Sequence, residues 1–334
     1  MSARVAFLTG GSGFVGANLA RALLAEGWRV RALARPASDL RNLEGLDVEI
    51  VRGDLGEETD LPRALRGSDA LFHVAAHYSL ARRDAAELQR SNVAGTRRIL
   101  AAARTAGVGR TVYTSSVAAI GVKSGGIADE SYQSPRERLI GAYKRSKFDA
   151  EAEAVAASRG GQDVVIVNPS TPIGAWDRKP TPTGDLLLRF FRGRMPALVD
   201  TGLNFVDVAD VARGHLLACD KGRSGERYIL GGENVSMRVL LQRAGAIAGL
   251  EAPKVVIPHV IPLVIAHIDE YVVAPLLRRA PSIPIDGVRM SREAMYYDTS
   301  KARDRLGFDP RPIDSAIQAA FRWYGEHGYL SRSR

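Results

Sequence analysis

The chain has 334 residues, of which 46% are hydrophobic and 25% charged, a composition that fits a globular protein and excludes a disordered or fibrous chain. Its formal net charge of +9 comes from basic residues scattered along the sequence, so we expect no nucleic-acid partner and instead an anionic cofactor or substrate. The single cysteine, Cys219, can neither close an intramolecular disulfide nor build a thiolate metal site, and it favours a reducing compartment, the cytoplasm.

The first apolar run is too short for a targeting signal, because Thr9, Gly10 and Gly11 interrupt it. No stretch reaches the ~18 apolar residues of a membrane helix, so no integral membrane segment is expected. The nearest candidate spans 255–275, where prolines, histidines and two acidic residues break the run. We interpret this segment as the apolar wall of a substrate pocket or a dimer face, with contact to a membrane surface as a further alternative.

Apolar strands and helical patterns alternate through the first half of the chain. Strands are predicted at 4–8, 29–34, 48–51, 70–76, 110–115 and 163–168, and helices at 14–25, 92–106 and 137–158. Such alternation requires right-handed crossovers between parallel strands, and the near-continuous apolar character of the strands indicates a sheet covered on both faces. The predicted fold class is α/β, with a doubly wound parallel sheet.

The alternation stops after Pro169. Prolines and glycines make 170–184 loop-rich, and the pattern then predicts a helix near 185–192, a strand–helix unit over 205–219 and a strand at 227–231. Helices dominate the remainder. We expect one domain over 1–169, to whose sheet 205–232 returns, and a smaller C-terminal substrate-binding lobe built from 170–204 and 233–330.

A glycine-rich loop, TGGSGFVG at 9–16, joins the first predicted strand to the first helix. Gly10 permits a tight turn, Gly13 allows the backbone to approach a pyrophosphate, and Gly16 lets the helix pack closely on the sheet. The amides that begin the helix then face the phosphates, where the helix dipole favours negative charge. The spacing predicts a Rossmann domain that binds a dinucleotide.

The residue that follows the second strand distinguishes NAD from NADP enzymes, because the former place an acid there and the latter a base. Arg35 occupies this position, and Ser38 with Arg41 can add donors for a 2′-phosphate. Asp39 is the competing observation, since its carboxylate either folds back to the ribose or caps the following helix. NADP is the predicted cofactor and NAD the alternative. Asp54, after the third strand, either accepts the adenine amino group or caps a helix.

Tyr143 and Lys147 lie four residues apart on a predicted helix, so they share one face. A tyrosine is a poor proton donor or acceptor at neutral pH, because its ordinary pKa is ~10. A lysine ammonium one turn away, with an oxidised nicotinamide nearby, stabilises the phenolate and lowers that pKa. The predicted strand at 110–115 leads into Ser115 and Ser116, whose hydroxyls can hydrogen-bond a substrate oxygen.

The combination of these features resembles an extended short-chain dehydrogenase/reductase, and the resemblance covers essentially the whole chain. It rests on TGGSGFVG at 9–16, Asp54, VYTSS at 112–116, Y-x-x-x-K at 143–147, NVAGT at 92–96, NPST at 168–171, DVADVA at 207–212 and YILGG at 228–232.

The resemblance implies that Tyr143 is the general acid/base, that Lys147 binds the nicotinamide ribose and tunes the tyrosine, and that Ser116, five residues before Gly121, orients the substrate oxygen. It implies a structural role for Asn92 in the helix beside the site. It also implies a homodimer paired through the Tyr-Lys helix, whose stretch 148–157 is rich in alanine. The expected cofactor-binding residues are Gly10, Gly13, Phe14, Val15, Gly16, Arg35, Ser38, Asp54, Leu55, Ala75, Tyr143, Lys147 and Pro169.

Two kinds of relative compete within this superfamily. The stretches VRALARPASDLRNLEG and VYTSSVAAIG are similar to dihydroflavonol-4-reductases, whereas VNPSTPIGAWDRKPTPTG and YILGGENVSM are similar to the hopanoid-associated sugar epimerase subfamily. Nucleotide-sugar epimerases carry an Arg-Asp-Phe-Val stretch, in place of which this chain has TGLNFV at 201–206; Arg178 and Lys179 can still hold an anionic group.

The predicted function is therefore NAD(P)-dependent hydride transfer between nicotinamide and a secondary alcohol or ketone. The alternative is a nucleotide-sugar epimerase or dehydratase that uses the same Ser116, Tyr143 and Lys147. A dinucleotide sensor without catalysis is a third hypothesis, which an intact set of these three residues disfavours. The expected partner is accordingly a small carbonyl, alcohol or sugar substrate.

The remaining signals are weaker. His73 is predicted to be a neutral core residue, and His77, with Tyr78, either lines the substrate or belongs to an ordinary loop. Trp176 either forms a lid or anchors the proline-rich loop. No two histidines have metal-ligand spacing, so no metal is expected.

Overall fold

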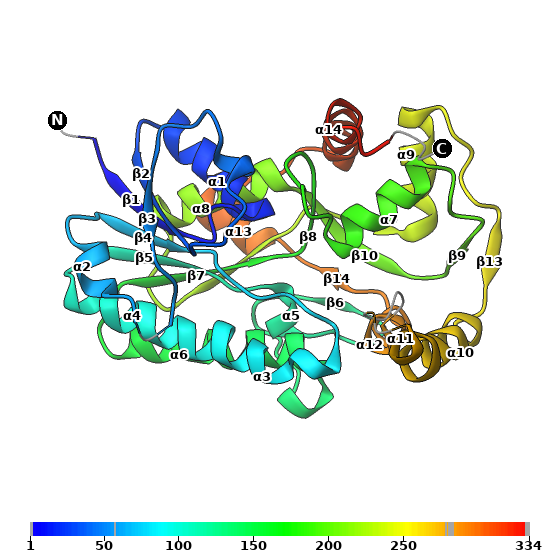
Figure 1. Cartoon of the computed structure of the whole chain (residues 1–334), viewed down its shortest axis with the longest axis horizontal. Coiled ribbons are helices and arrows are strands. Elements are labelled where there is room, and N and C mark those ends of the chain that lie inside the picture. Colours follow the sequence, from blue (N-terminus) through cyan, green and yellow to red (C-terminus); the bar gives the residue numbers. More distant parts are fainter. Residues whose placement is uncertain (1–2, 57, 278, 280–283, 331–334) are drawn as a thin grey trace.

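The computed structural model describes residues 3–56, 58–277, 279 and 284–330. Its centre is a parallel sheet of seven strands in the order β11-β7-β5-β4-β1-β2-β3 (Figure 1), and this confirms the predicted doubly wound fold. The strands of this sheet are β1 (Val5–Thr9), β2 (Arg29–Ala34), β3 (Val48–Arg52), β4 (Ala70–His73), β5 (Arg110–Thr114), β7 (Val164–Pro169) and β11 (Arg227–Leu230).

Helices cover both faces of this sheet (Figure 1). Helices α1 (Phe14–Ala25) and α8 (Val208–Lys221) pack on one face, and α2 (Leu61–Leu65), α4 (Gly95–Thr105) and α6 (Ala142–Arg159) on the other. Strand β1 shows why: Ala6 and Leu8 join the core under α1 and α8, whereas Phe7 points into the core under α2 and α4. A strand buried on both faces needs an unbroken apolar run, as this sequence has.

Several element boundaries differ from those predicted. The helix expected at 137–158 begins at Ala142, because Gly141 precedes it with φ +87, a conformation incompatible with a helix interior. Residues Arg136–Arg138 form a separate 3-10 turn, η4. The helix expected at 92–106 starts as a π-helical stretch, η3 (Gln89–Ala94), before α4, and the strand expected at 70–76 ends at His73.

The segment expected to return to the large sheet divides between two sheets. Strand β11 belongs to the large sheet, and helix α8 packs on that sheet. Strand β10 (Gly202–Asp207) instead pairs with β8 (Thr171–Ile173) and β12 (Glu233–Ser236) in a three-stranded sheet. Strand β8 lies inside the stretch predicted to be loop-rich. A second core forms around this small sheet, with α7 (Pro182–Phe191), α9 (Met237–Ala248) and α14 (Ile313–Glu326).

Shorter elements complete the chain. They are η1 (Arg41–Leu43), η2 (Arg82–Asp84), α3 (Ala85–Leu88), α5 (Val117–Ile120), β6 (Ile127–Ala128), β9 (Ala197–Val199), β13 (Val255–Ile257), α10 (Val260–Ile268), η5 (Asp269–Val273), α11 (Ala274–Leu276), α12 (Ile285–Met290), β14 (Tyr296–Tyr297) and α13 (Ser300–Leu306). Within the described part of the chain, no helix combines the length and the apolar character that crossing a bilayer would need.

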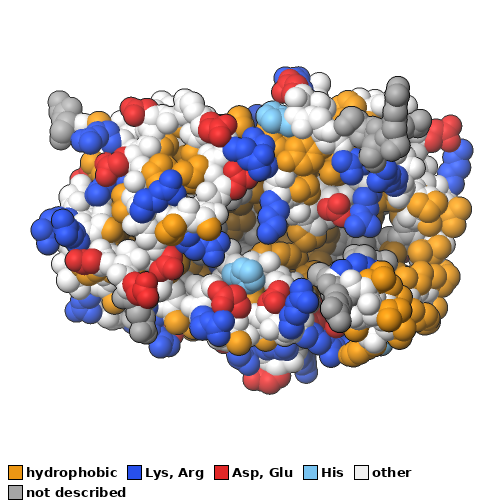
Figure 2. Space-filling model, in the orientation of Figure 1, with side chains coloured by type: hydrophobic (Ala, Val, Ile, Leu, Met, Phe, Trp, Pro, Cys, Tyr) orange, Lys and Arg blue, Asp and Glu red, His pale blue; other side chains and the backbone are white. Residues whose placement is uncertain are grey.

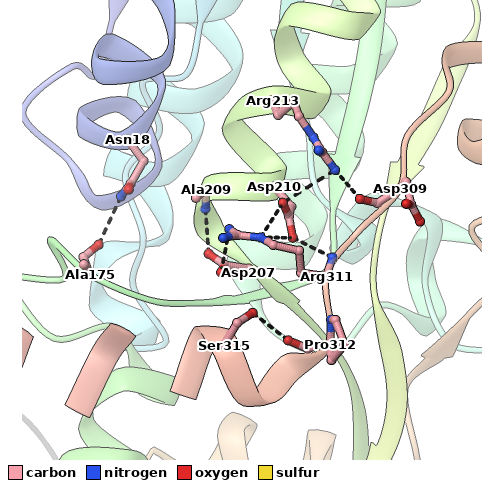
Figure 3. Close-up of polar contacts among 10 residues, drawn as sticks. All are labelled: Asn18, Ala175, Asp207, Ala209, Asp210, Arg213, Asp309, Arg311, Pro312 and Ser315. Atoms are coloured by element: carbon pink, nitrogen blue, oxygen red, sulfur yellow. Dashed lines mark hydrogen bonds and ion pairs between the residues drawn. The ribbon is translucent and has the colours of Figure 1, made fainter. Parts of the chain in front are cut away.

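A half-exposed arginine and two buried carboxylates connect the two cores (Figure 3). The carboxylate of Asp207 caps α8 by accepting from the Ala209 amide at 2.9 Å, and Arg311, just before α14, donates to it at 2.8 Å. The same guanidinium donates to Asp210 at 3.1 Å. Burial raises the pKa of Asp207, and the charge of Arg311 opposes that rise. The contacts of Arg311 with the two carboxylates hold α14 against the start of α8.

Candidate active site

Ser116 lies at the carboxyl end of β5, where it begins the short helix α5. Its hydroxyl accepts a hydrogen bond from the Ala118 amide at 3.1 Å, so the side chain caps the helix while its oxygen remains near the sheet edge. The side-chain amide of Asn168, on β7, donates to the Ser116 carbonyl at 3.1 Å and to Glu151 at 2.7 Å. Two adjacent strands therefore fix the position of the serine.

Tyr143 meets Ser116 from the first turn of α6. A hydrogen bond with Ser116 lowers the pKa of the tyrosine, but burial outweighs it and raises that pKa to about 12. The tyrosine of the ligand-free protein is therefore a protonated phenol at neutral pH. A phenol in this state is suited to donate a proton to a substrate oxygen that also hydrogen-bonds the Ser116 hydroxyl.

Lys147 is one helical turn beyond Tyr143 and is almost completely buried. Its ammonium donates to the carbonyl of Thr114 at 2.9 Å and to the hydroxyl of Tyr113 at 3.3 Å, both on β5. Burial lowers the pKa of Lys147 to about 8, and the charge of Glu151 opposes that shift. The lysine therefore remains mostly protonated at neutral pH, as a cation fixed beside the tyrosine.

Tyr78 covers Tyr143 from the loop that follows β4. The two rings meet edge to face with centroids 4.5 Å apart. Asn92 holds this loop: its side chain accepts from the His77 amide at 2.7 Å, and it donates to the His77 carbonyl and to the Ser146 hydroxyl at 2.9 Å each. The sequence identified Asn92 as structural, but it did not reveal that Tyr78 lies against the proposed catalytic tyrosine.

The glycine loop has the shape that a bound pyrophosphate needs. Gly10 has φ +73, and a Cβ there would come within 2.7 Å of the Ala75 amide nitrogen, so only glycine fits the turn. A Cβ on Gly16 would collide with the Gly10 carbonyl, so this glycine lets α1 approach the loop itself. A Cβ on Gly13 would meet only the Gly10 oxygen, at 3.3 Å, which leaves its outer side open to a ligand. The residues present therefore fit a dinucleotide.

Arg35 is exposed directly after β2, beside the glycine loop, since Leu33 of β2 pairs with Thr9 of β1. Within the described part of the chain no ion pair engages its guanidinium, whereas Arg41 forms a forked pair with Asp39 at 2.6–3.1 Å. Asp39 also accepts from the Arg41 amide at 3.1 Å, which starts η1. Ser38 is half-buried, and its amide donates to the Arg35 carbonyl at 3.0 Å.

The other expected cofactor-binding residues border the same sheet edge. Asp54 is exposed and accepts from the Gly56 amide at 2.6 Å, a turn-forming bond that leaves its second oxygen available. The Leu55 carbonyl accepts from Arg98 at 2.8 Å, and the Ala75 amide donates to the Thr9 hydroxyl at 3.1 Å. Pro169 ends β7 and is buried. Phe14 and Val15 form the first turn of α1.

His73 and Trp176 have structural environments. His73 is fully buried between the hydroxyls of Thr9 at 2.7 Å and Thr96 at 3.0 Å, and burial lowers its pKa to about 3, so it is a neutral core histidine. Arg21 stacks on Trp176, 3.4 Å from the ring centre, and Asn42 donates to the Trp176 carbonyl at 3.2 Å. These contacts anchor the proline-rich loop to α1.

Comparison with known proteins agrees with this geometry. Residues 6–231 match the family described as the NAD dependent epimerase/dehydratase family. A Synechocystis sp. protein that carries the provisional name dihydroflavonol 4-reductase is 57% identical over 329 residues, 97% of this chain and 95% of that protein. The sterol demethylase protein B of Methylococcus capsulatus is 38% identical over 97% of this chain and 99% of that protein. A nucleoside-diphosphate-sugar epimerase from Pseudomonas aeruginosa is a solved structure with a TM-score of 0.80, 27% identity, and 99% and 100% coverage of the two chains.

Proposed function

Because this chain belongs to the NAD dependent epimerase/dehydratase family, whose members are NAD-dependent enzymes, we propose that it is a reductase that moves hydride between a nicotinamide and a secondary alcohol or ketone. The observation that carries the proposal is the convergence of Ser116, Tyr143 and Lys147 at the ends of β5 and α6. A dinucleotide sensor has no use for a proton donor held by a serine and a buried ammonium.

The chain supplies every group that the proton transfer requires. Bound nicotinamide would supply or accept the hydride. The Ser116 hydroxyl orients the substrate oxygen, and the Tyr143 hydroxyl gives that oxygen a proton in reduction and takes it back in oxidation. The Lys147 ammonium stabilises the phenolate left on Tyr143, and with a dinucleotide bound it would also hold the nicotinamide ribose. Tyr78 shields the tyrosine from water and presents an aromatic wall, which favours an apolar substrate, as does the name of the Methylococcus relative.

Net reduction is favoured over sugar epimerisation by the residues at 203–204. These positions correspond to the Arg-Asp pair of nucleotide-sugar epimerases, and they are Leu203 and Asn204 here. Asn204 is buried and donates to Asn234 at 2.8 Å and to the Tyr297 carbonyl at 3.3 Å, so it braces the small sheet. Neither side chain carries the positive charge with which the arginine of that pair would bind a pyrophosphate. The epimerase remains the second candidate, because the family and the Pseudomonas structure carry that name.

NADP is the proposed form of the cofactor. Arg35 provides a cation beside the glycine loop, and Asp39, the acid that could bind an NAD ribose, is paired with Arg41. The pairing supports NADP, because Asp39 would have to leave Arg41 before it could bind a ribose. The proposed cofactor site comprises Gly10, Gly13, Phe14, Val15, Gly16, Arg35, Ser38, Asp54, Leu55, Ala75, Tyr143, Lys147 and Pro169.

We also propose how the chain divides into a cofactor-binding domain and a substrate-binding lobe. The dinucleotide domain comprises 1–169 together with α8 and β11, and the substrate lobe is built around the small sheet and the helices that follow it. We propose that the protein forms a homodimer through α6. We also propose that it acts in the cytoplasm, where the buried thiol of Cys219 stays reduced.

Two measurements separate reductase from epimerase. First, the purified protein is denatured and the released nucleotide is quantified; a reductase, which exchanges its cofactor every cycle, should release little. Second, NADPH consumption is followed with a panel of ketones, from small to sterol-sized, with Tyr143→Phe as the inactive control. Tightly held NAD near one per chain, with no ketone-dependent loss of NADPH, would reverse the choice.

A further inference from the structure

The exposed apolar side chains of this protein are concentrated on one segment. Eleven of the fifteen exposed large apolar residues in the described part of the chain lie between Val255 and Leu277. Figure 2 shows them gathered at the end of the molecule where Figure 1 places α10. We call nine of them the α10 face: Val260, Ile261, Val264, Ile265, Ile268, Tyr271, Val272, Leu276 and Leu277.

Helix α10 is apolar on its outer side as well as its inner side. Its inner side contributes Leu263 and Ala266 to a small core with Ile285 and Val288 of α12. Val264 and Ile268 are one turn apart on the outer side, and about half of each is exposed. A helix that faces water on its outer side normally carries polar residues there. An apolar patch of this extent marks an interaction surface.

The charges around the α10 face are arranged for an anionic partner. The segment has two acids, and both turn inward: Asp269 is buried and accepts from Arg279, and Glu270 accepts from the Ile285 amide at 3.1 Å. Exposed arginines lie on the neighbouring elements, namely Arg82 and Arg83 of η2, Arg289 of α12, and Arg292 after it. Arg83 is 3.7 Å from Asp84 and Arg289 is 4.0 Å from the buried Asp286, while Glu293 is an exposed acid beside Arg292. Arg82 also approaches the two inward acids Glu270 and Asp286, each at 3.9 Å.

The α10 face adjoins the loop that covers the active site. Arg82 donates to the Tyr271 hydroxyl at 3.3 Å, and Arg82 follows Tyr78 by four residues along the chain. Tyr78 in turn lies against Tyr143. A surface that engages the α10 face therefore lies next to the segment that closes over the proposed proton donor.

We propose that the α10 face docks the protein on the surface of an anionic lipid bilayer. The aliphatic side chains enter the boundary between headgroups and acyl chains, Tyr271 sits at headgroup level, and the arginines of the neighbouring elements meet the lipid phosphates. Because the inner side of α10 is packed on α12, the helix lies in the plane of the interface. Docking in this orientation gives an apolar substrate a short path from the bilayer to Tyr143.

Co-sedimentation of the full chain with phosphatidylcholine vesicles, with and without phosphatidylglycerol, tests the proposal. The wild type should bind the phosphatidylglycerol vesicles, and binding should weaken with salt because part of it is electrostatic. Ile268→Asp should reduce the partition coefficient by roughly tenfold or more, since a charge replaces an apolar group that enters the bilayer. The matched control is Ile127→Asp, because Ile127 is 51% exposed and Ile268 52% exposed.

Circular dichroism of both variants confirms that each is folded. Failure of the wild type to bind either kind of vesicle overturns the proposal, as does equal binding by Ile268→Asp and the wild type. Sedimentation equilibrium without lipid supplies the remaining outcome. If Ile268→Asp abolishes self-association while vesicle binding is absent, the α10 face is an interface between two copies of the chain.

Discussion

The ammonium of Lys147 donates a hydrogen bond to the backbone carbonyl of Thr114 at 2.9 Å, so the end of β5 fixes the cation that α6 brings to the site. Ser116 follows Thr114 by two residues, and Tyr143 precedes Lys147 by one helical turn. One strand end and one helix start therefore determine the relative positions of all three proposed catalytic groups.

Tyr143→Phe should abolish turnover, with a loss of at least about a hundredfold in kcat, because the ring remains and only the proton-transfer hydroxyl is removed. Dinucleotide affinity, measured by fluorescence titration, should change little. Tyr132→Phe is the control, since the hydroxyl of that half-buried tyrosine bonds the Val122 carbonyl at 3.0 Å and the Ser134 hydroxyl at 3.2 Å. Retained activity in Tyr143→Phe contradicts the catalytic assignment.

The pH dependence of ketone reduction should report Lys147. Burial lowers the pKa of this lysine to about 8, so its cation is present below that pH and is lost as the pH rises through it. We expect kcat/KM to be flat below about pH 8 and to fall above it, because kcat/KM reports the groups of the free enzyme. Lys147→Ala should lose both dinucleotide affinity and turnover.

Lys144 provides the control for the fall of kcat/KM above pH 8, the descending limb of the pH profile. It is also buried, and burial lowers its pKa to about 8. Its ammonium contacts the Met295 sulfur at 3.5 Å rather than the groups of β5. Lys144→Met should keep the descending limb; if the limb disappears in this variant, it belongs to Lys144 and the assignment to Lys147 is wrong.

The sequence predicted the large sheet well because the burial of its strands leaves a local signature. The predicted ranges 14–25 and 29–34 coincide with α1, which Gly27 closely follows, and with β2, which Arg35 and Pro36 follow. The start of α6 was predicted five residues early, since the amphipathic pattern extends past Gly141 but its positive φ does not permit a helix. The hydrophobic pattern of the sequence does not indicate the positive φ of Gly141.

The site was predictable only in part for a related reason. Ser116, Tyr143 and Lys147 have recognisable spacing, but the contact of Tyr78 with Tyr143 joins loops that are distant in sequence. The bonds of Asn204 to Asn234 and Tyr297 depend likewise on how the small sheet closes. Long-range contacts of this kind follow from packing, and no period of 2 or 3.6 residues encodes them.

Arg35→Asp should weaken NADPH binding and improve NADH binding. A charge-assisted hydrogen bond to the 2′-phosphate contributes roughly 1.5–3 kcal/mol, so the Kd for NADPH should rise by about 10- to 100-fold. Isothermal titration with both cofactors measures the change. Arg29→Asp is the control, because Arg29 is likewise an exposed arginine but stands at the opposite end of β2. A tenfold preference of the wild type for NADH would refute the argument from Arg35.

Stability should fall in acid because His73 and His215 are buried as neutral groups. Burial lowers the pKa of His73 to about 3 and that of His215 to about 4, both below the ordinary 6.5. The unfolded chain therefore binds protons at these histidines that the folded chain does not bind. The free energy of unfolding falls accordingly as the pH decreases from 6.5 toward these pKa values. Each histidine should cost about 2 kcal/mol between pH 6.5 and about pH 5.

His215→Gln isolates one of these contributions. His215 bonds the Val211 carbonyl and the Thr114 hydroxyl, both at 2.8 Å, and glutamine retains hydrogen-bonding groups without a titrating ring. Urea unfolding at several pH values should give a shallower dependence in the variant, by up to one proton. Asp177, whose pKa burial raises to about 6, changes the absolute slope of both proteins but cancels in their difference. Identical slopes would show that His215 does not contribute.

The proposed homodimer predicts that Ala152→Arg yields a monomer. Ala152 and Ala156 are exposed one turn apart on the outer side of α6, where small side chains permit close approach of a second helix. An arginine at Ala152 would force charge and bulk into that contact, and the dissociation constant should rise by at least about a hundredfold, since an unpaired buried charge is costly. Light scattering at micromolar concentration measures the mass, and Ala246→Arg, at an exposed alanine of α9, is the control. Alanine also favours helix formation in itself, so a wild-type protein that is already monomeric would mean that the alanines of α6 serve the helix and not an interface.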